Sequence, residues 1–409
     1  MTDPIVTSRS EAAVPPIMLI ALALLAAVPP LATDMYLPGF PAMADEFRTS
    51  PSTIQLTLTT FMIGLAIGQL IIGPISDRLG RRHLLLAGTS VCIAASVACA
   101  LAPNVEFLLV FRFLQGFTGA AGIVLGRAVI SDRAHGAQAA KAFSVVMAIN
   151  GIAPVAAPLL GGVIIEQSDW HVVFWVLTAL AVAMLLGVIL HIGESHPPEL
   201  RSTGGIGSVL TDLRAVVTDR RYLGYTITFV FGFGSMFSYI AASPFVFQDL
   251  FGLSTIAFST VFACNAIGLI AANILNAKLV DRLGARMLLQ VGLGVLVVFT
   301  AALVVATLAD AGLAVTVVLL WVAVSSVGLV MANGTALAVE QTRRTAGSGS
   351  AVLGAAQFGL AAAVSPLVGI GGAATAVPMV VTMLGCALIA VAGLALTRGR
   401  AGQRAPEAT

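Results

Sequence analysis

The stretch GPISDRLGRR, residues 73–82, joins two long apolar runs, and a similar stretch, NAKLVDRLGAR, joins another two at residues 276–286. Asp77 and Asp281 hold equivalent places in the two stretches, half a chain length apart. A proline also lies upstream of each stretch at a similar distance. We interpret the chain as two copies of one helical unit, because the similarity extends over neighbouring apolar runs.

The composition is that of a membrane protein. The chain has 409 residues, of which 58% are hydrophobic and 10% are charged, against roughly 25% charged residues in soluble domains. Apolar runs of about 20 residues, enough to cross a bilayer as a helix, recur along its whole length. These lengths suit helices and not the shorter strands of a barrel. We therefore expect an all-α membrane protein and exclude a soluble one.

We expect twelve transmembrane helices in two six-helix halves. The expected spans are 17–38, 54–75, 83–102, 107–130, 142–165, 171–192, 222–243, 255–277, 287–308, 313–336, 347–370 and 376–397. The expected segments are a cytosolic N-terminus (1–16), an N-terminal half (17–192), a cytosolic linker (193–221), a C-terminal half (222–397) and a cytosolic tail (398–409). As an alternative, the first span could be a signal peptide, whose cleavage would leave eleven spans and unequal halves.

Lysine and arginine set the expected orientation. With the N-terminus in the cytosol, all but three of the 21 basic residues fall in cytosolic segments, the exceptions being Arg48, Arg112 and Arg127. Such a bias is typical of cytosolic loops, so we expect both termini in the cytosol. The net charge of +2 is explained by this topology and predicts no nucleic-acid partner.

The sequence gives no support to enzymatic or metal chemistry. The four cysteines lie inside expected spans, where a thiol is usually a small packing residue, so we expect no disulfide and no metal site. The five histidines lie in loops or at span ends, and no metalloprotease, nucleophile-elbow or phosphate-loop motif occurs. We expect neither an enzyme nor a cofactor.

The repeated turn resembles a family signature. The major facilitator superfamily carries the pattern G-x-x-x-D-R-x-G-R-[RK] between its second and third spans. The matching residues are Gly73, Asp77, Arg78, Gly80, Arg81 and Arg82. The resemblance implies the major facilitator fold, with substrate bound near the midplane between the halves. It also implies that the motif forms a charge relay and latch on the cytosolic face.

The second copy of the turn is less complete. Asp281, Arg282, Gly284 and Arg286 remain, but the stretch begins with Asn276 and lacks the leading glycine. A purely structural alternative exists for both copies, because aspartate can cap a helix, glycine can reverse the chain and arginine can anchor the cytosolic side. That alternative does not explain why equivalent places carry the same residues.

Two further elements resemble those of drug/proton antiporters in this superfamily. One is R-x-x-Q-G in the fourth span, and the other is G-P-x-x-G-G in the fifth, whose first glycine is Ala157 here. The matching residues are Arg112, Gln115 and Gly116, and then Pro158, Gly161 and Gly162. With DMYLPGFPAM, residues 34–43, they make the chain most similar to the bicyclomycin-resistance and chloramphenicol/florfenicol exporter group.

This resemblance implies a proton-coupled multidrug efflux antiporter of the bacterial inner membrane. It would act as a monomer by alternating access, with a drug and protons as its partners and no cofactor. A metabolite exporter or importer on the same fold is the alternative, since charges in the cavity also suit a polar metabolite. For the fifth-span element, the alternative is that proline and glycine only kink or pack a helix.

Asp34 and Arg112 are the two charges within the spans that need an explanation, since burying a charge is costly unless it is paired, protonated or hydrated. Counted from the external span ends, they lie at similar depths. The resemblance supplies their lateral proximity, because the first, fourth, seventh and tenth spans of the family line the central cavity. We expect a proton-coupling pair, with a helix cap as the alternative for Asp34. Arg127, near a span end, is expected to reach the lipid headgroups.

The expected substrate site adds aromatic and polar residues to this pair. Aromatic side chains recur at every fourth residue of the seventh span, which suggests a wall for flat apolar drugs, with packing or lipid contact as the alternative. The candidate substrate-binding residues are Asp34, Tyr36, Arg112, Gln115, Phe229, Phe233, Met236 and Asn333.

Overall fold

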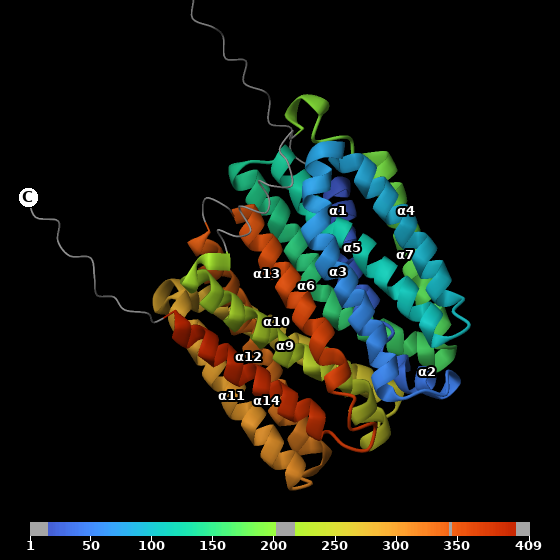
Figure 1. Ribbon diagram of the computed structural model, residues 1–409, viewed down its shortest axis with the longest axis vertical. Helices are drawn as coiled ribbons and strands as arrows, with labels where there is room; N and C mark the ends of the chain where they lie inside the picture. The colour runs from blue at the N-terminus through green and yellow to red at the C-terminus, as the bar shows by residue number, and fades with distance from the viewer. Residues whose placement is uncertain (1–14, 202–216, 343–345, 398–409) are drawn as a thin grey trace, which may run out of the picture.

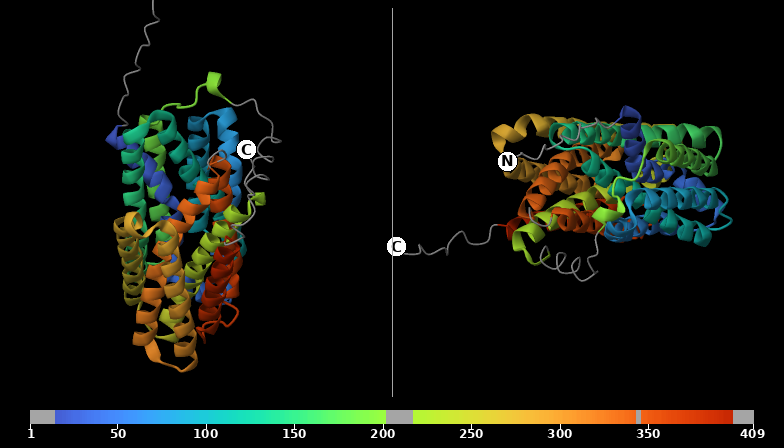
Figure 2. Two further views of the ribbon diagram at one scale, coloured as in Figure 1. Left: turned by 90° about the vertical axis from the view of Figure 1, so that its left-hand side faces the viewer. Right: turned by 90° about the horizontal axis from the view of Figure 1, so that it is seen from above.

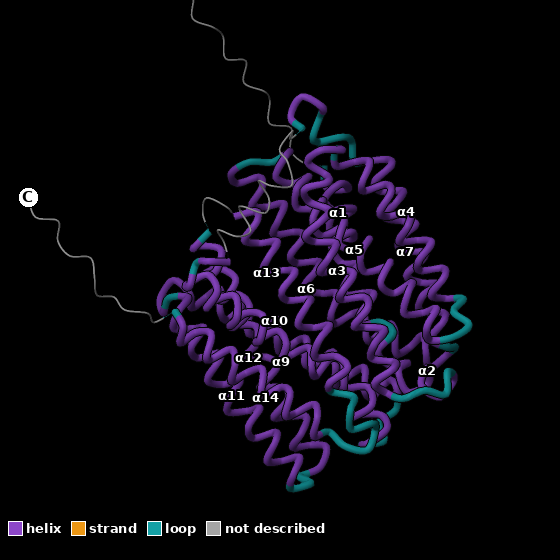
Figure 3. The backbone as a smooth tube through the Cα atoms, in the orientation of Figure 1, coloured by secondary structure: helices purple, strands orange, loops and turns teal. Residues whose placement is uncertain are grey.

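The computed structural model describes residues 15–201, 217–342 and 346–397, and within these ranges every regular element is a helix (Figure 3). Twelve helices are long and apolar enough to cross a membrane, which confirms the expected number. The N-terminal segment, part of the expected linker and the C-terminal tail lie outside the described residues.

The N-terminal half contains the first six membrane-crossing helices. The first is interrupted, and consists of α1 (Pro16–Asp34), the short 3₁₀ turn η1 (Leu37–Gly39) and α2 (Phe40–Glu46). The others are α3 (Pro51–Leu79), α4 (Arg81–Ala100), α5 (Val105–Arg133), α6 (Gly136–Gln167) and α7 (Trp170–His191). Three of them begin at side-chain caps, because Ser50, Asn104 and Asp169 accept hydrogen bonds from the first turns of α3, α5 and α7.

The C-terminal half repeats this plan. After the short turn η2 (Pro198–Leu200), it consists of α9 (Arg220–Pro244), the π-helical turn η3 (Phe245–Leu250), α10 (Thr255–Leu283), α11 (Ala285–Leu308), α12 (Gly312–Gln341), α13 (Ala346–Leu367) and α14 (Val377–Leu396). Asp219 and Ser254 cap α9 and α10. The first helix of each half therefore changes its geometry near a proline, at Pro38 and at Pro244.

The two halves form separate groups of helices that meet mainly along two pairs of long helices. Figure 1 shows α1–α7, blue to green, on one side and α9–α14, yellow to red, on the other. Across the boundary, α13 packs against α3, and α10 packs against α6. The view from above shows the same division (Figure 2, right).

The two ends of the bundle differ. We call the end that carries the α3–α4 turn, residues 79–81, the motif end, and the end that carries η1, α2 and η3 the distal end. At the distal end the halves are tied by hydrogen bonds. Gln55 Nε2 donates to the carbonyl oxygen of Ala241, and Ser365 Oγ donates to that of Gln55, each at 3.0 Å. Gln248 Nε2 donates to the carbonyl of Pro38 at 3.0 Å. The bundle is therefore closed at its distal end.

Candidate transport cavity

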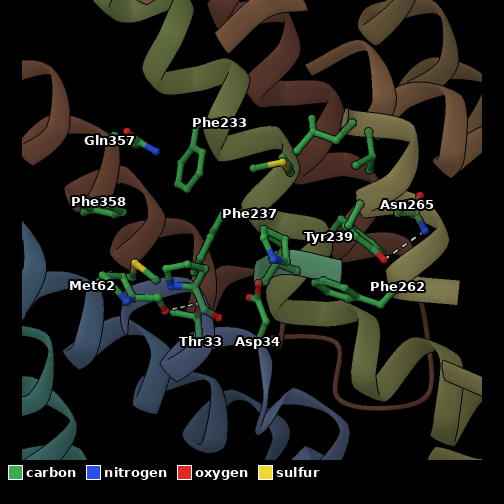
Figure 4. A pocket seen from close by; sticks show the side chains of 18 of the residues that line it. Thr33, Asp34, Met62, Phe233, Phe237, Tyr239, Phe262, Asn265, Gln357 and Phe358 are labelled. Carbon is green, nitrogen blue, oxygen red and sulfur yellow. Dashed lines mark hydrogen bonds between the residues drawn. The ribbon is translucent and has the colours of Figure 1, made fainter. Parts of the chain in front are cut away.

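A cavity of about 230 Å³ lies between the two halves (Figure 4). Its walls come from α1, α3, α5, α6, α9, α10, α12 and α13, a wider set than the four cavity-lining spans that the family resemblance implies. The aromatic and thioether members are Met62, Phe233, Met236, Phe237, Tyr239, Phe262 and Phe358. Among the described residues that line the cavity, Asp34 is the one charged side chain. We call this space the central cavity.

Asp34 reaches the central cavity because it is the last residue of α1. Pro29 and Pro30 lie one turn before it and have no N–H groups, and Thr33 Oγ1 donates to the carbonyl of Pro29 at 2.8 Å. The next turn, η1, begins without a side-chain cap hydrogen bond. The alternative that Asp34 caps this turn is therefore unsupported, and the carboxylate faces the cavity between aromatic side chains (Figure 4).

Arg112 does not form the expected contact with Asp34. Its guanidinium carbon lies 4.4 Å from the ring centroid of Tyr36 and 4.2 Å from that of Phe61, within the N-terminal half. The side chain is fully buried, and no ion pair joins it to Asp34 among the described residues. Equal depth along two helices does not fix the directions in which their side chains point, and here Arg112 points away from the boundary between the halves.

A buried polar network surrounds Arg112. Its Nη1 donates to Gln115 Oε1 at 2.6 Å, and Gln115 Nε2 donates to Ser96 Oγ at 2.8 Å. Tyr36 and Thr57 share a hydroxyl–hydroxyl hydrogen bond of 2.9 Å, and Arg112 Nε donates to the carbonyl of Thr57 at 3.4 Å. Tyr36, Arg112 and Gln115 were expected to touch substrate, but in this conformation they lie outside the lining of the central cavity.

Two more candidate substrate residues pack away from the central cavity. Phe229 lies against Gly334 in the apolar core of the C-terminal half. Asn333 Nδ2 donates to Asn276 Oδ1 at 2.6 Å, a hydrogen bond that joins α10 to α12. Phe233 and Met236 do line the cavity, as expected.

Most of the residues that line the central cavity were not among the expected substrate residues, including four with large side chains. Met62 comes from α3, Phe262 from α10, and Gln357 and Phe358 from α13. None of them belongs to a motif, and apolar residues such as Met62, Phe262 and Phe358 are also abundant on lipid-facing surfaces. Their presence in uncharged spans gave no signal that could separate them from packing residues.

The first DRLGRR turn carries a connected set of charges. Arg81 forms an ion pair with Asp77 at 2.5 Å and lies 3.4 Å from Asp132 at the end of α5. The backbone N–H groups of Arg81 and Arg82 donate to the Glu194 carboxylate at 2.9 and 3.3 Å. The segment after α7 therefore covers the start of α4.

These contacts change the pKa of the Glu194 carboxylate. Partial burial alone would raise its pKa, but the backbone N–H groups of His196, Arg81 and Arg82, together with the charge of Arg201, hold the pKa of Glu194 below its ordinary value. The ionised form is therefore the one that binds the turn.

Glycine is required in both copies of the turn. Gly80 has φ +95°, and a Cβ there would lie 2.5 Å from Glu194 Oε2. Gly284 has φ +80°, with nothing within 4 Å of a Cβ. Among the described residues, Asp281 and Arg282 form no ion pair. The second copy thus preserves the backbone of the first but not its charge contacts.

The glycines of the fifth span allow two neighbouring segments to pack closely against α6. A Cβ at Gly161 would overlap the carbonyl oxygen of Met35, the residue that follows Asp34. A Cβ at Gly162 would overlap the Ser259 hydroxyl on α10 of the other half. With Pro158 one turn earlier, this element sets the packing of α6 against both the Asp34 segment and the C-terminal half.

A second cavity, of about 450 Å³, lies at the motif end. It is lined by α3, α4, α5 and α13, and Ile123 lines both this cavity and the central one. Arg127 is exposed and belongs to its wall, so its side chain faces the space between the halves. Whether Arg127 also reaches lipid headgroups stays a prediction. We call this space the motif-end cavity.

Comparison with known proteins identifies close relatives. The chain is 38% identical to an uncharacterized MFS-type transporter, YdgK, of Bacillus subtilis over 93% of its length and 96% of the relative. It is 30% identical to a bicyclomycin resistance protein homolog of Haemophilus influenzae, covering 92% and 94% of the two chains. It is 31% identical to a chloramphenicol resistance protein of Pseudomonas aeruginosa, covering 65% and 63%. The resemblance to the bicyclomycin- and chloramphenicol-resistance group is confirmed.

The fold is shared with solved transporters. The crystal structure of the nucleoside transporter NupG carrying a D323A substitution superposes with a TM-score of 0.73 at 11% identity, over 93% of this chain and 99% of that one. Residues 22–366 match the Major Facilitator Superfamily. The chain therefore belongs to the Major Facilitator Superfamily, whose members are transporters and not enzymes.

Proposed function

We propose that this chain is a proton-coupled drug exporter that works by alternating access in a bacterial inner membrane. The observation that carries the proposal is the composition of the central cavity, whose aromatic and thioether wall contains one charged side chain, Asp34, among the described residues. The apolar wall suits drugs with large hydrophobic surfaces. The relatives named for bicyclomycin and chloramphenicol resistance support the same substrate class.

The proposed orientation places the motif end in the cytosol, as the distribution of lysine and arginine predicts. The present conformation is then inward-facing, because the distal end is closed by the Gln55 and Gln248 hydrogen bonds and the motif-end cavity adjoins the central one at Ile123. Drug binds from the cytosol in this state. Opening of the distal end would release it outside.

Asp34 is the proposed proton carrier. Burial among apolar side chains disfavours a charged carboxylate. Because Asp34 lines the cavity that would hold the drug, drug occupancy and proton occupancy are coupled. If protonation of Asp34 changes the affinity for drug by some factor, then drug binding changes the proton affinity of Asp34 by the same factor. One charge crossing about 100 mV supplies ~2.3 kcal/mol, enough for a roughly fifty-fold drug gradient. Because Arg112 lies away from Asp34 here, a contact between them would require another conformation.

The test is an assay in everted vesicles. Wild-type protein should dissipate an imposed pH gradient when a phenicol is added, whereas Asp34→Asn should not, because an amide cannot carry the proton. Asp310→Asn, the same substitution at a distal turn, is the control and should behave as wild type. Gradient dissipation by Asp34→Asn at the wild-type rate would remove Asp34 from the coupling. Dissipation by sugars or amino acids, but not by drugs, would favour a metabolite transporter.

A further inference from the structure

We propose that the motif-end cavity is a second binding site, which takes the oxyanion of an organic anion, such as a carboxylate, sulfonate or phosphate, with Arg127 as its anchor. The inference goes beyond drug export. It rests on the charge of this cavity, which is opposite to that of the central cavity.

The shape of the motif-end cavity suits a molecule of drug size. It holds about 450 Å³, and its polar members besides the charged ones are Gln69, Ser348 and Ser350. Towards the central cavity its wall becomes apolar at Leu70 and Ile123. A ligand with a charged head and an apolar body therefore fits with its head towards the motif end.

Arg127 is the unpaired charge among the described residues that line this cavity. The other two charged lining residues, Asp77 and Arg81, are paired at 2.5 Å, and Arg81 also contacts Asp132 outside the cavity. Within the described part of the chain, Arg127 makes no side-chain hydrogen bond or ion pair. The described residues that line the cavity thus carry a net positive charge, with an accessible guanidinium.

A guanidinium in this position selects oxyanions. Its planar fork of N–H groups matches two oxygen atoms of a carboxylate, sulfonate or phosphate. Serine hydroxyls can donate to a further oxygen of a sulfonate or phosphate. An anion that moved from the motif-end cavity into the central cavity would meet the carboxylate of Asp34. When Asp34 is ionised, the two negative charges repel, so the anion stays in the motif-end cavity. Such an oxyanion comes from a soluble organic acid or from an anionic phospholipid headgroup.

The test measures binding to purified protein in detergent by calorimetry, with 2-naphthalenesulfonate and 2-naphthylmethylammonium as matched probes. Arg127→Gln should weaken sulfonate binding about tenfold, since a hydrogen bond to a charged group contributes ~1.5 kcal/mol or more. Arg127→Lys should weaken it less. Arg133→Gln is the control, because Arg133 lies on the same helix but its guanidinium donates to the Gly193 carbonyl. This substitution should leave sulfonate binding unchanged. Asp77→Asn should strengthen sulfonate binding, because it removes a nearby negative charge.

A second measurement identifies the source of the oxyanion. The same titration in nanodiscs of phosphatidylcholine, with and without phosphatidylglycerol, should show competition only if lipid headgroups occupy the site, and both results agree with an oxyanion site. Sulfonate binding that is equal in wild type and Arg127→Gln, or equally reduced in Arg133→Gln, would overturn the proposal. No proton gradient enters this assay, so its failure is separate from any failure of drug/proton exchange.

Discussion

The aromatic side chains of α9 show how one residue position decides between packing and substrate contact. Tyr225 and Phe229 belong to the apolar core of the C-terminal half, whereas Phe233 and Phe237 line the central cavity. A step of four residues turns an α-helix by about 400°, so a stripe of this spacing drifts by roughly 40° per step. The stripe therefore passes from the core to the cavity along α9.

This drift gives a matched pair of substitutions. Phe233→Ala should weaken drug binding roughly three- to tenfold, because it removes a ring from the cavity wall. Phe229→Ala should leave drug affinity unchanged and lower the unfolding temperature, since Phe229 packs in the core. Binding is measured by tryptophan-quenching titration and stability by thermal unfolding. Equal losses of affinity in both variants would contradict the assignment of the cavity wall.

The sequence could predict that Asp34 faces a functional site, but not where the side chain of Arg112 lies. An isolated carboxylate in an apolar run indicates a functional site, and the structure places Asp34 in the central cavity. The position of Arg112 depends on the rotation of α5 and on cation–π contacts with Tyr36 and Phe61. These contacts join residues far apart in the chain, and no local pattern encodes them.

Among the elements, α6 depends most directly on its glycines. Gly161→Ala should destabilise the protein and impair transport, because the added methyl group meets the Met35 carbonyl, a backbone atom that cannot move without displacing the Asp34 segment. Gly151→Ala on the same helix has open space and should be neutral, or stabilising by up to about 1 kcal/mol. Thermal unfolding and vesicle transport check both. A Gly161→Ala variant as active and as stable as wild type would show that α6 can shift freely.

The segment after α7 should respond to acid. The pKa of Glu194 is lowered in the folded protein, so its stabilising effect is complete above the ordinary glutamate pKa, about 4.3, and is lost as the pH falls through the lowered value. Hydrogen exchange in residues 193–201 should therefore rise, relative to the intrinsic rate, below about pH 4. Glu194→Gln should show fast exchange at every pH. A wild-type profile without this acid limb would mean that Glu194 does not hold the turn.

The first DRLGRR turn was predictable from the sequence, whereas its contact with the segment after α7 was not. The pattern of the first copy matches the family, and both turns have a glycine with positive φ, as their sequences indicate. The contact with Glu194 brings a residue more than a hundred positions away onto the turn. Only packing of α7 beside α4 creates it.

For the whole molecule, the distal hydrogen bonds set the balance between conformations. Gln55→Leu should open the distal end more often, because it removes a side-chain hydrogen bond that ties the two halves together at the Ala241 carbonyl. In a cysteine-free background, maleimide labelling of Phe40→Cys, fully buried at the distal end, should become several-fold faster. Gln290→Leu, on α11, is the control and should not change the rate. Unchanged labelling with Gln55→Leu would exclude these bonds from the closure.

The number of spans and the division into halves could be predicted because each span is a local property of about 20 residues. The conformation in which the halves meet is not local. It depends on small differences between two sets of contacts across α3, α6, α10 and α13, which a hydropathy pattern does not contain.

Ile123 lies at the junction of the two cavities, and this position has a kinetic consequence. A side chain between two compartments changes how fast a molecule crosses from one to the other, while the ratio of occupancies at equilibrium depends only on the compartments. The width of this passage would therefore set the turnover rate of large substrates separately from their affinity. Two compounds that bind equally well could then be exported at very different speeds, and resistance in a growing cell would follow the speed.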